Sequence, residues 1–337
     1  MSQEKRPGKG QINLDGIVGQ ARLVARLRQL LDEGVPSHAY LFSGAEGMGK
    51  KTVARAFAAH WICTGNPPVP CGRCRSCTTF AAGTHPDVVL IRPVDGKIPI
   101  DAIRDMQESF STTPLFGQRL CLLEDAEKMN ESAQNCLLKT LEEPPAHTLI
   151  LMTASGFDAL QATIRSRVVR LPLDGYSPAE LNEILSRTSN SRMTDFHMAF
   201  SQGIPGRAMS LMLSKTLEPN RQKVTAVLPQ GISPLEASGM ESLWRHLGEN
   251  KADFTEIVDL LQGLLRDLLA AREGVESRLI NADKTDTIRR TARLRTREDW
   301  MTAIDLVDDI RLGMRNNLNY QIAVDALNAA LGPLFDG

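Results

Sequence analysis

The chain has 337 residues, with 39 Lys or Arg and 40 Asp or Glu, which gives a formal net charge of −1 at pH 7. This length allows two or three domains, each with its own hydrophobic core, and the near-zero charge excludes a general attraction to nucleic acid. No apolar run reaches the roughly 18 to 20 residues that a membrane span requires. Residues 1–10 also lack the apolar centre of a signal peptide, so we expect a cytoplasmic protein with no membrane partner.

The first half of the chain predicts an α/β domain. Five short apolar runs alternate with helical stretches, which is typical of a parallel sheet covered by helices. The runs are residues 38–43, 87–92, 119–124, 148–154 and 168–173. Because open sheets of this kind bind ligands at the carboxyl ends of their strands, we expect the functional side chains directly after these runs.

A glycine-rich phosphate loop follows the first run. Gly44, Gly47 and Gly49 precede Lys50, and a helical stretch follows. Backbone N–H groups in such a loop, the helix dipole and the lysine ammonium all favour bound phosphate. The alternative is a glycine-rich turn without a ligand.

The residue after Lys50 departs from the usual loop. A Ser or Thr normally stands there to hold magnesium, but this chain has Lys51, and the hydroxyl comes one residue later at Thr52. One helical step turns a side chain by about 100°, away from the phosphate side. We therefore expect that ATP or ADP can bind and that magnesium-dependent chemistry is weakened.

Four of the six cysteines form a compact cluster in residues 63–80. Four thiolates at this spacing close a tetrahedral site with no open position, which is typical of structural zinc in a reducing compartment. The sequence predicts a zinc knuckle inserted in the α/β domain, with free thiols as the alternative. The predicted ligands are Cys63, Cys71, Cys74 and Cys77.

The third run ends in an acidic pair, Glu124 and Asp125. Phosphate-loop ATPases use such a pair to hold magnesium and to orient the attacking water, but with Asp first and Glu second. The reversed order displaces both carboxylates by about one C–C bond, which suits octahedral magnesium poorly. A solvated acidic pair is the alternative.

The second half of the chain predicts helices only. Ser177 and Glu180 supply an N-cap and a capping glutamate, and a small helical unit should run to about residue 213. Residues 219–234 look like a linker, and the apolar spacing of 235–334 predicts a bundle of about five helices. The predicted domains are residues 1–174, 175–215 and 216–337.

The order of these motifs resembles a known family. Residues 85–87 read His-Pro-Asp, residues 138–145 read Leu-Lys-Thr-Leu-Glu-Glu-Pro-Pro, and residues 166–167 read Ser-Arg. Together with the loop and the cysteines, they resemble the bacterial clamp-loader subunits of DNA polymerase III. The resemblance implies an AAA+ ATPase domain with a zinc knuckle, an all-α lid and an all-α collar. It also implies a five-membered ring that places a sliding clamp on primed DNA.

The resemblance also implies roles for single residues. Arg167 matches an arginine finger that acts in trans on a neighbour's ATP, with a salt bridge as the alternative. Thr153 matches the position that orients water, and could equally be a hydroxyl satisfied by backbone. Arg207 matches the second sensor arginine of the lid, with helix capping as the alternative. Residues 18–20 resemble the segment that approaches adenine, and residues 316–319 resemble the start of the last collar helix.

The family contains motor subunits, gamma and tau, and a stator type, delta prime. Motor subunits have a hydroxyl after the loop lysine, an Asp-Glu pair and a Cys after Ser-Arg. This chain has Lys51, the Glu-Asp order and Val168 instead, so it favours the delta prime type with weak or absent ATPase activity. The expected partners are gamma or tau, the delta subunit, the clamp and, through the ring, DNA. The alternatives are an active motor subunit and, less close to the motifs, a small-molecule phosphotransferase.

Overall fold

The computed structural model describes residues 13–35, 37–188, 193–228, 243, 253–315 and 318–335. Within them the chain forms two compact units. Unit 1 comprises the described residues of 1–189 together with 204–206, and unit 2 comprises those of 190–203 and 207–337. The predicted division at residues 174 and 215 stays a prediction. No helix in the described ranges is both long and apolar enough to cross a membrane.

Unit 1 is built on a five-stranded parallel sheet in the order β2-β3-β4-β1-β5. All five predicted runs form strands, with ends that differ by at most one residue from the prediction. The strands are β1 (Ala39–Ser43), β2 (Val88–Ile91), β3 (Arg119–Leu123), β4 (Thr148–Ala154) and β5 (Val169–Pro172). The central strands β1, β3 and β4 are buried throughout, which is why they read as continuous apolar runs.

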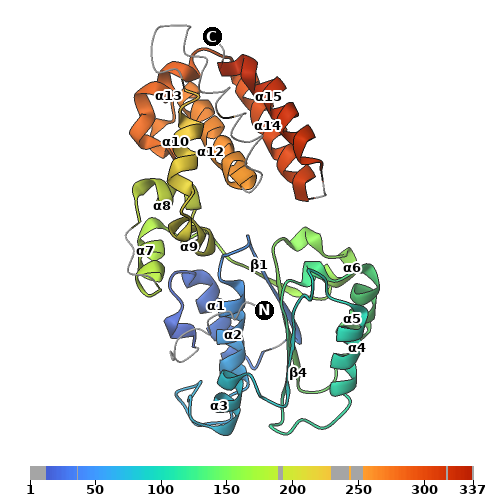
Figure 1. The fold of residues 1–337 in the computed structure, drawn as a ribbon. Coiled ribbons are helices and arrows are strands. Elements are labelled where there is room, and N and C mark those ends of the chain that lie inside the picture. Colours follow the sequence, from blue (N-terminus) through green and yellow to red (C-terminus); the bar gives the residue numbers. More distant parts are fainter. Residues whose placement is uncertain are drawn as a thin grey trace. The chain divides into compact units, whose positions relative to one another are not determined.

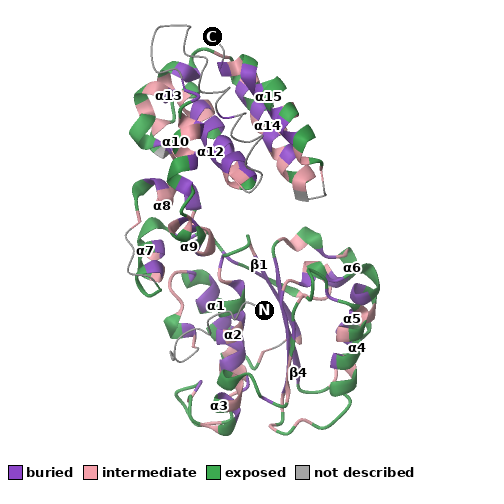
Figure 2. Cartoon of the chain, in the orientation of Figure 1, coloured by how far each residue is buried: buried purple, intermediate pink, exposed green. Residues whose placement is uncertain are grey.

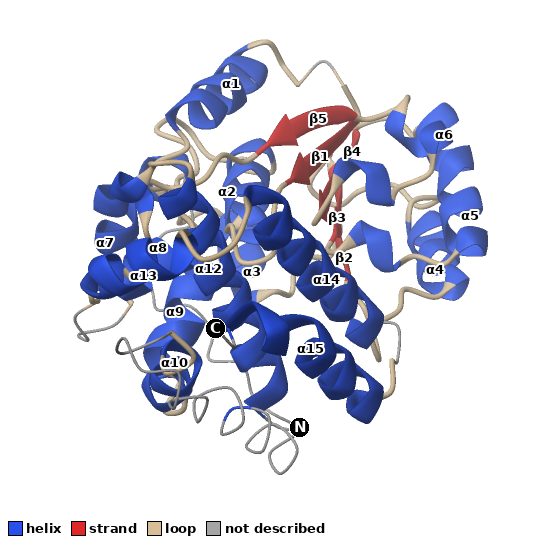
Figure 3. Cartoon of the chain, turned by 90° about the horizontal axis from the view of Figure 1, so that it is seen from above, coloured by secondary structure: helices blue, strands red, loops and turns tan. Residues whose placement is uncertain are grey.

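Helices cover both faces of the sheet, as the α/β pattern predicts (Figures 1 and 3). One face carries α1 (Ala21–Asp32), α2 (Lys50–Trp61) and α3 (Arg75–Ala82). The other carries α4 (Ile100–Ser109), α5 (Glu131–Glu142) and α6 (Ala162–Arg165). Figure 2 shows β1 and β4 buried between these layers. The fold thus brings the carboxyl ends of β1, β3 and β4 to one edge, next to the start of α2.

The helix α7 (Pro178–Ser186) starts as the sequence predicts. The Ser177 side chain accepts a hydrogen bond from the Glu180 backbone N–H, and the Glu180 carboxylate accepts one from the Ser177 N–H. This capping box satisfies two backbone donors that a helix start otherwise leaves open.

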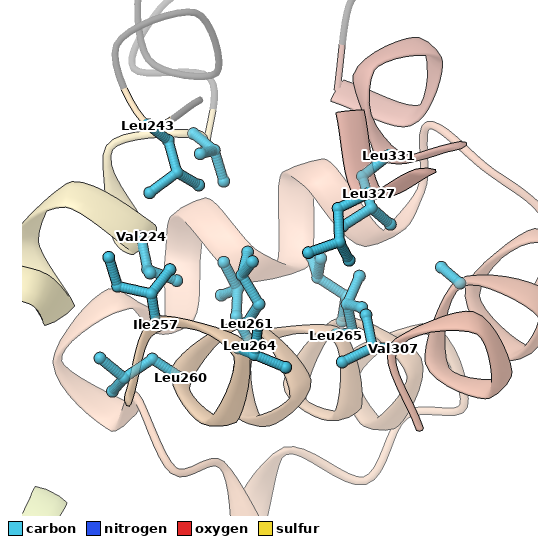
Figure 4. Close-up of a cluster of buried hydrophobic side chains, with 14 of the residues drawn as sticks. Val224, Leu243, Ile257, Leu260, Leu261, Leu264, Leu265, Val307, Leu327 and Leu331 are labelled. Atoms are coloured by element: carbon cyan, nitrogen blue, oxygen red, sulfur yellow. The ribbon is translucent and has the colours of Figure 1, made fainter. Parts of the chain in front are cut away.

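Unit 2 is helical and centres on α12 (Phe254–Arg272). Figure 4 shows Leu261, Leu264 and Leu265 of α12 facing Val307 and Leu327 in a fully apolar cluster. In the described ranges, the other helices are α8 (Asp195–Ser201), α9 (Pro205–Leu213, which begins in unit 1), α10 (Leu217–Thr225), α13 (Thr285–Ala292), α14 (Arg297–Arg315) and α15 (Tyr320–Phe335).

The linker predicted over residues 219–234 is wrong in its first part. Residues 219–225 belong to α10, since Pro219 stands in the first turn, where a helix tolerates proline without losing a hydrogen bond. Residues 229–234 lie outside the described part of the chain, as do residues 316 and 317 of the predicted last collar helix. Residues 318 and 319 precede α15, which begins at Tyr320 and forms the rest of that helix.

We expect Leu264→Ala to lower the free energy of unfolding of unit 2 by about 2–5 kcal/mol, because Leu264 is fully buried and its loss leaves a cavity. Urea unfolding followed by circular dichroism would measure the change. Leu213→Ala is the matched control, because that side chain is 80% exposed and should cost little. Equal effects of the two substitutions would contradict the core assignment.

Candidate functional site

The predicted phosphate loop joins the end of β1 to the start of α2. Gly47 and Gly49 have φ values of 82° and 84°, a left-handed conformation that side chains disfavour, and Gly49 is the N-cap of α2. Among the described residues, the backbone N–H groups of Glu46, Gly47, Gly49 and Lys50 have no protein acceptor. A curved loop with open N–H groups at a helix N-terminus suits a phosphate chain.

Lys50 is folded onto the loop itself. Its side chain is buried, and the Nζ atom donates to the carbonyl oxygens of Gly44 at 2.7 Å and of Ala45 at 2.9 Å. Burial lowers the pKa of Lys50, and the nearby carboxylate of Glu127 acts in the opposite direction. The ammonium therefore lies inside the loop, where a phosphate would meet it.

Lys51 contacts the predicted acidic pair. Its Nζ atom lies 2.9 Å from Asp125 Oδ2 and 3.4 Å from Glu124 Oε2. Burial alone would lower the pKa of Lys51, but the hydrogen bond to Asp125 and the charge of Glu124 outweigh it and raise the pKa. The lysine that replaces the usual hydroxyl thus remains charged and neutralises the acids that follow β3.

Two arginines complete the neutralisation of Glu124, which is buried. Arg55 Nη2 lies 3.1 Å from Glu124 Oε1, and Arg92 Nε lies 3.1 Å from Glu124 Oε2. Neither arginine is among the site residues predicted from the sequence. Arg55 stands four residues after Lys51, on the same face of α2, and Arg92 directly follows β2, the neighbour of β3 in the sheet. Helical spacing and strand ends could have identified them.

These contacts test whether the site fits magnesium. A magnesium ion needs carboxylate oxygens together with several waters in near-octahedral geometry. Here the Lys51 ammonium lies against both carboxylates, and Thr52 is exposed and is not among the side chains that contact them. The residues of this site therefore do not fit magnesium in the way that an active phosphate-loop ATPase requires.

Thr153 holds the turn after β3. It is buried at the end of β4, and its Oγ1 accepts a hydrogen bond of 2.9 Å from the backbone N–H of Asp125. Asp125 has a φ of 55°, an uncommon value for a residue with a side chain. Of the two interpretations of Thr153, the structure contains the one in which its hydroxyl is paired with a backbone group. A contact of Thr153 with attacking water stays a prediction.

Arg167 lies between α6 and β5. Its Nη2 atom is 2.8 Å from Glu142 Oε1, and its Nη1 donates to the Thr163 carbonyl oxygen at 2.9 Å. The ion pair of Arg167 with Glu142 joins the Ser-Arg motif to the end of α5. The salt bridge that was the alternative to an arginine finger is therefore present within the chain. The side chain of Arg167 is 36% exposed and that of Glu142 is 51% exposed. An ion pair at such a surface contributes about 0–1 kcal/mol to stability. The guanidinium can therefore exchange this partner for another anion at little cost.

Arg207 belongs to unit 2. Its guanidinium carbon lies 4.6 Å from the centre of the Phe200 ring, a cation–π contact. Burial lowers its pKa, while the nearby Asp259 acts in the opposite direction. The structure thus gives Arg207 a packing partner on α8, and its predicted role as a sensor stays a prediction.

The four predicted zinc ligands come together. Their sulfur atoms all lie within 4.8 Å of one another, so the cluster could hold a metal ion. Cys63 follows α2, and Cys74 is the N-cap of α3. Gly65 is required here, because a Cβ atom on it would lie 2.4 Å from the sulfur of Cys71.

Backbone N–H groups surround these sulfur atoms. Cys71 N–H donates to Cys63 Sγ at 3.4 Å, Cys74 N–H to Cys71 Sγ at 3.3 Å, and Cys77 N–H to Cys74 Sγ at 3.4 Å. Such bonds favour the thiolate, the form that binds metal. The residues therefore fit a closed, structural tetrathiolate site.

His85 connects the cysteine knuckle to β2. Its Nε2 lies 2.9 Å from Ser76 Oγ, which itself donates to the Ile62 carbonyl oxygen, and its Nδ1 accepts from the Asp87 backbone N–H at 3.1 Å. Because the serine proton is already used, Nε2 must be the donor, and the ring is neutral. The Asp87 carboxylate accepts from the N–H groups of residues 115 and 116. The His-Pro-Asp motif thus has a structural role.

This geometry predicts a pH dependence of stability. Burial lowers the pKa of His85, so as the pH falls below about 6.5 the unfolded chain takes up the proton before the folded chain does. Stability from this residue is therefore complete above that pH and is lost as the pH falls through the lowered value. We expect His85→Gln to reduce this loss in thermal unfolding between pH 7.5 and 5.5. The exposed His147→Gln should leave it unchanged, and equal slopes for all three proteins would contradict the assignment.

A parallel sheet with a glycine loop after its first strand and an acidic pair after its third strand defines a phosphate-loop domain of the AAA+ type. Comparison with known proteins narrows this class. A family profile described as "DNA polymerase III, delta subunit" matches residues 19–176. The chain is 28% identical to the DNA polymerase III subunit delta prime of Bacillus subtilis, over 90% of this chain and 93% of that protein. It is 38% identical to the delta prime subunit of Pseudomonas aeruginosa, over 47% of this chain and 54% of that protein.

Tau subunits also match, for example that of Salmonella typhimurium at 32% identity, but over only 27% of its length. Among solved structures, a gamma subunit-related protein from Thermotoga maritima aligns with a TM-score of 0.45 at 19% identity, over 90% of this chain and 98% of that chain. The chain is thus similar to the delta prime subunits of DNA polymerase III from several bacteria.

Proposed function

We propose that this chain acts as the stator of a bacterial clamp loader and supplies Arg167 to the ATP of a neighbouring motor subunit. The neutralised acidic pair carries this proposal: Lys51, Arg55 and Arg92 occupy the carboxylates that a motor subunit keeps for magnesium. The chain keeps a phosphate loop and a half-exposed Arg167, and the described residues beside the loop do not fit magnesium. Such a subunit assists hydrolysis by others and performs little or none itself.

The proposed partners follow from the family. Gamma or tau subunits lie on one side of the stator and the delta subunit on the other, in a ring of five that loads the sliding clamp onto primed DNA. In this proposal, residues 175–215 form the lid and residues 216–337 form the collar that holds the ring together. Arg207 belongs to the lid, and its contact with Phe200 supports a role in fixing α9 against α8.

The proposal includes a structural zinc ion and a bound nucleotide. Zinc on Cys63, Cys71, Cys74 and Cys77 would hold the knuckle between α2 and α3. ATP or ADP would lie on the open N–H groups that precede α2.

The test is ATP turnover by the isolated, zinc-loaded chain in the presence of magnesium. We expect no turnover above the level of the Lys50→Ala variant, which lacks the loop ammonium. Turnover that depends on Lys50 would instead support the alternative, an active motor subunit of the gamma or tau type. A second variant combines Lys51→Thr with Glu124→Asp and Asp125→Glu. Turnover that appears only in this variant would show that these three residues set the difference between stator and motor.

A further inference from the structure

The charges beside the phosphate loop are arranged around one ammonium group. Two carboxylates, Glu124 and Asp125, face three cations, and of these only Lys51 contacts both acids. Glu124 is buried, so its charge would be costly without these partners. Lys51 itself is exposed along part of its length, on the side where α2 begins.

The position of Lys51 in the sequence matches the position of its ammonium in space. In phosphate-loop proteins, the residue directly after the loop lysine supplies a hydroxyl to magnesium, and an acid at the end of another strand of the sheet holds the ion from the other side. Lys51 is the residue directly after Lys50, and its Nζ lies 2.9 Å from Asp125 Oδ2. Lys51 therefore joins the first turn of α2 to the acid after β3, the two parts of the site that a magnesium ion would otherwise connect.

A phosphate chain bound to the loop would then face positively charged groups of the protein without a metal ion. Lys50 and the open N–H groups of the loop face the phosphate, and Lys51 adds an ammonium with a donor left over after its contacts with the two acids. The raised pKa of Lys51 keeps this charge at neutral pH. The Lys51 ammonium thus supplies one positive charge beside the loop, while the carboxylates of Glu127 and Glu46 act on Lys50.

We propose that the Lys51 ammonium replaces the divalent cation at this site, so that the phosphate loop binds nucleoside di- and triphosphates equally well with and without magnesium. The inference rests on the proposed nucleotide site. It goes beyond the stator function, because a stator needs no bound nucleotide. Lys51 is thus the residue that determines the metal independence of binding.

Calorimetric titration of the full-length, zinc-loaded chain with ADP and with ATP tests this proposal, once in excess EDTA and once in excess magnesium. We expect the two dissociation constants of each nucleotide to agree within about twofold. In Lys51→Thr, which restores the usual hydroxyl, affinity in EDTA should fall about tenfold or more, since a charge-assisted contact is lost. Lys97→Thr removes an exposed lysine elsewhere and should behave like the unaltered chain.

Two results would overturn the proposal. One is a tenfold or larger gain of affinity in the unaltered chain on adding magnesium. The other is the absence of ADP and ATP binding in both conditions. Both come from the unaltered chain, so the test does not depend on the folding of a variant. Neither result bears on the stator function. That function is tested separately, by the ATP turnover of the neighbouring motor subunit in an assembled ring.

Discussion

Arg167→Ala in a reconstituted ring is expected to lower ATP turnover at the adjoining motor site by about a thousandfold. An arginine that reaches the γ-phosphate of a neighbour contributes about 10³–10⁵ in rate. The ring should contain one motor subunit able to hydrolyse ATP, next to this chain, so that the affected site is the one measured. Arg167→Lys should recover little, because lysine keeps the charge but not the planar fork of donors.

The same variant should remain folded. The ion pair of Arg167 with Glu142 is half-exposed, so its loss should cost at most about 1 kcal/mol. Arg165→Ala is the matched control, because Arg165 stands two residues earlier and pairs with Asp158 on the surface of unit 1. Unchanged turnover in the Arg167→Ala ring, or an equal loss in the Arg165→Ala ring, would contradict the assignment of Arg167 as an arginine finger.

Cys74→Ser is expected to abolish the binding of one zinc ion per chain and to destabilise unit 1 by several kcal/mol. Structural zinc contributes its binding free energy to folding, and a three-thiolate site binds much more weakly than a closed one. Serine is itself a favoured N-cap, so the variant keeps the cap of α3 and removes only the ligand. Metal analysis and thermal unfolding would measure the two effects.

The control for this prediction is Cys136→Ser. Cys136 lies on α5, where its sulfur contacts Gln107 Oε1, away from the cysteine cluster. We expect this variant to keep its zinc ion. A wild-type chain purified without chelators that contains no zinc, or a Cys74→Ser variant that retains it, would contradict the assignment.

The sheet could be predicted closely because its signal is local. Central strands that are buried on both faces must be apolar throughout, and turns or charges delimit them, so all five strands were located from the sequence. The start of α7 was equally clear, since a capping box is a local pattern. The missed part of α10 shows the limit of such signals, because Pro219 is typical of a linker and is also tolerated in the first turn of a helix.

The site could be predicted in its residues but not in its contacts. The sequence showed that Lys51 replaces a hydroxyl and that Glu124 and Asp125 are reversed. It could not show that the lysine reaches both acids, because that depends on the length and direction of a flexible side chain. The roles of Arg55 and Arg92 depend on a buried carboxylate that gathers cations from two other elements, which is a tertiary property. The cysteine cluster could be predicted both in its residues and in their proximity, since the spacing of the cysteines already restricts their geometry.

We propose that this chain is the stator of the ring and not a motor. The most direct measurement is the composition of the ring, determined by native mass spectrometry after mixing the zinc-loaded chain with the motor and delta subunits of the same organism. We expect one copy of this chain in each five-subunit ring. Several copies per ring, or a stable ring formed without any other motor subunit, would contradict it and identify this chain as the motor.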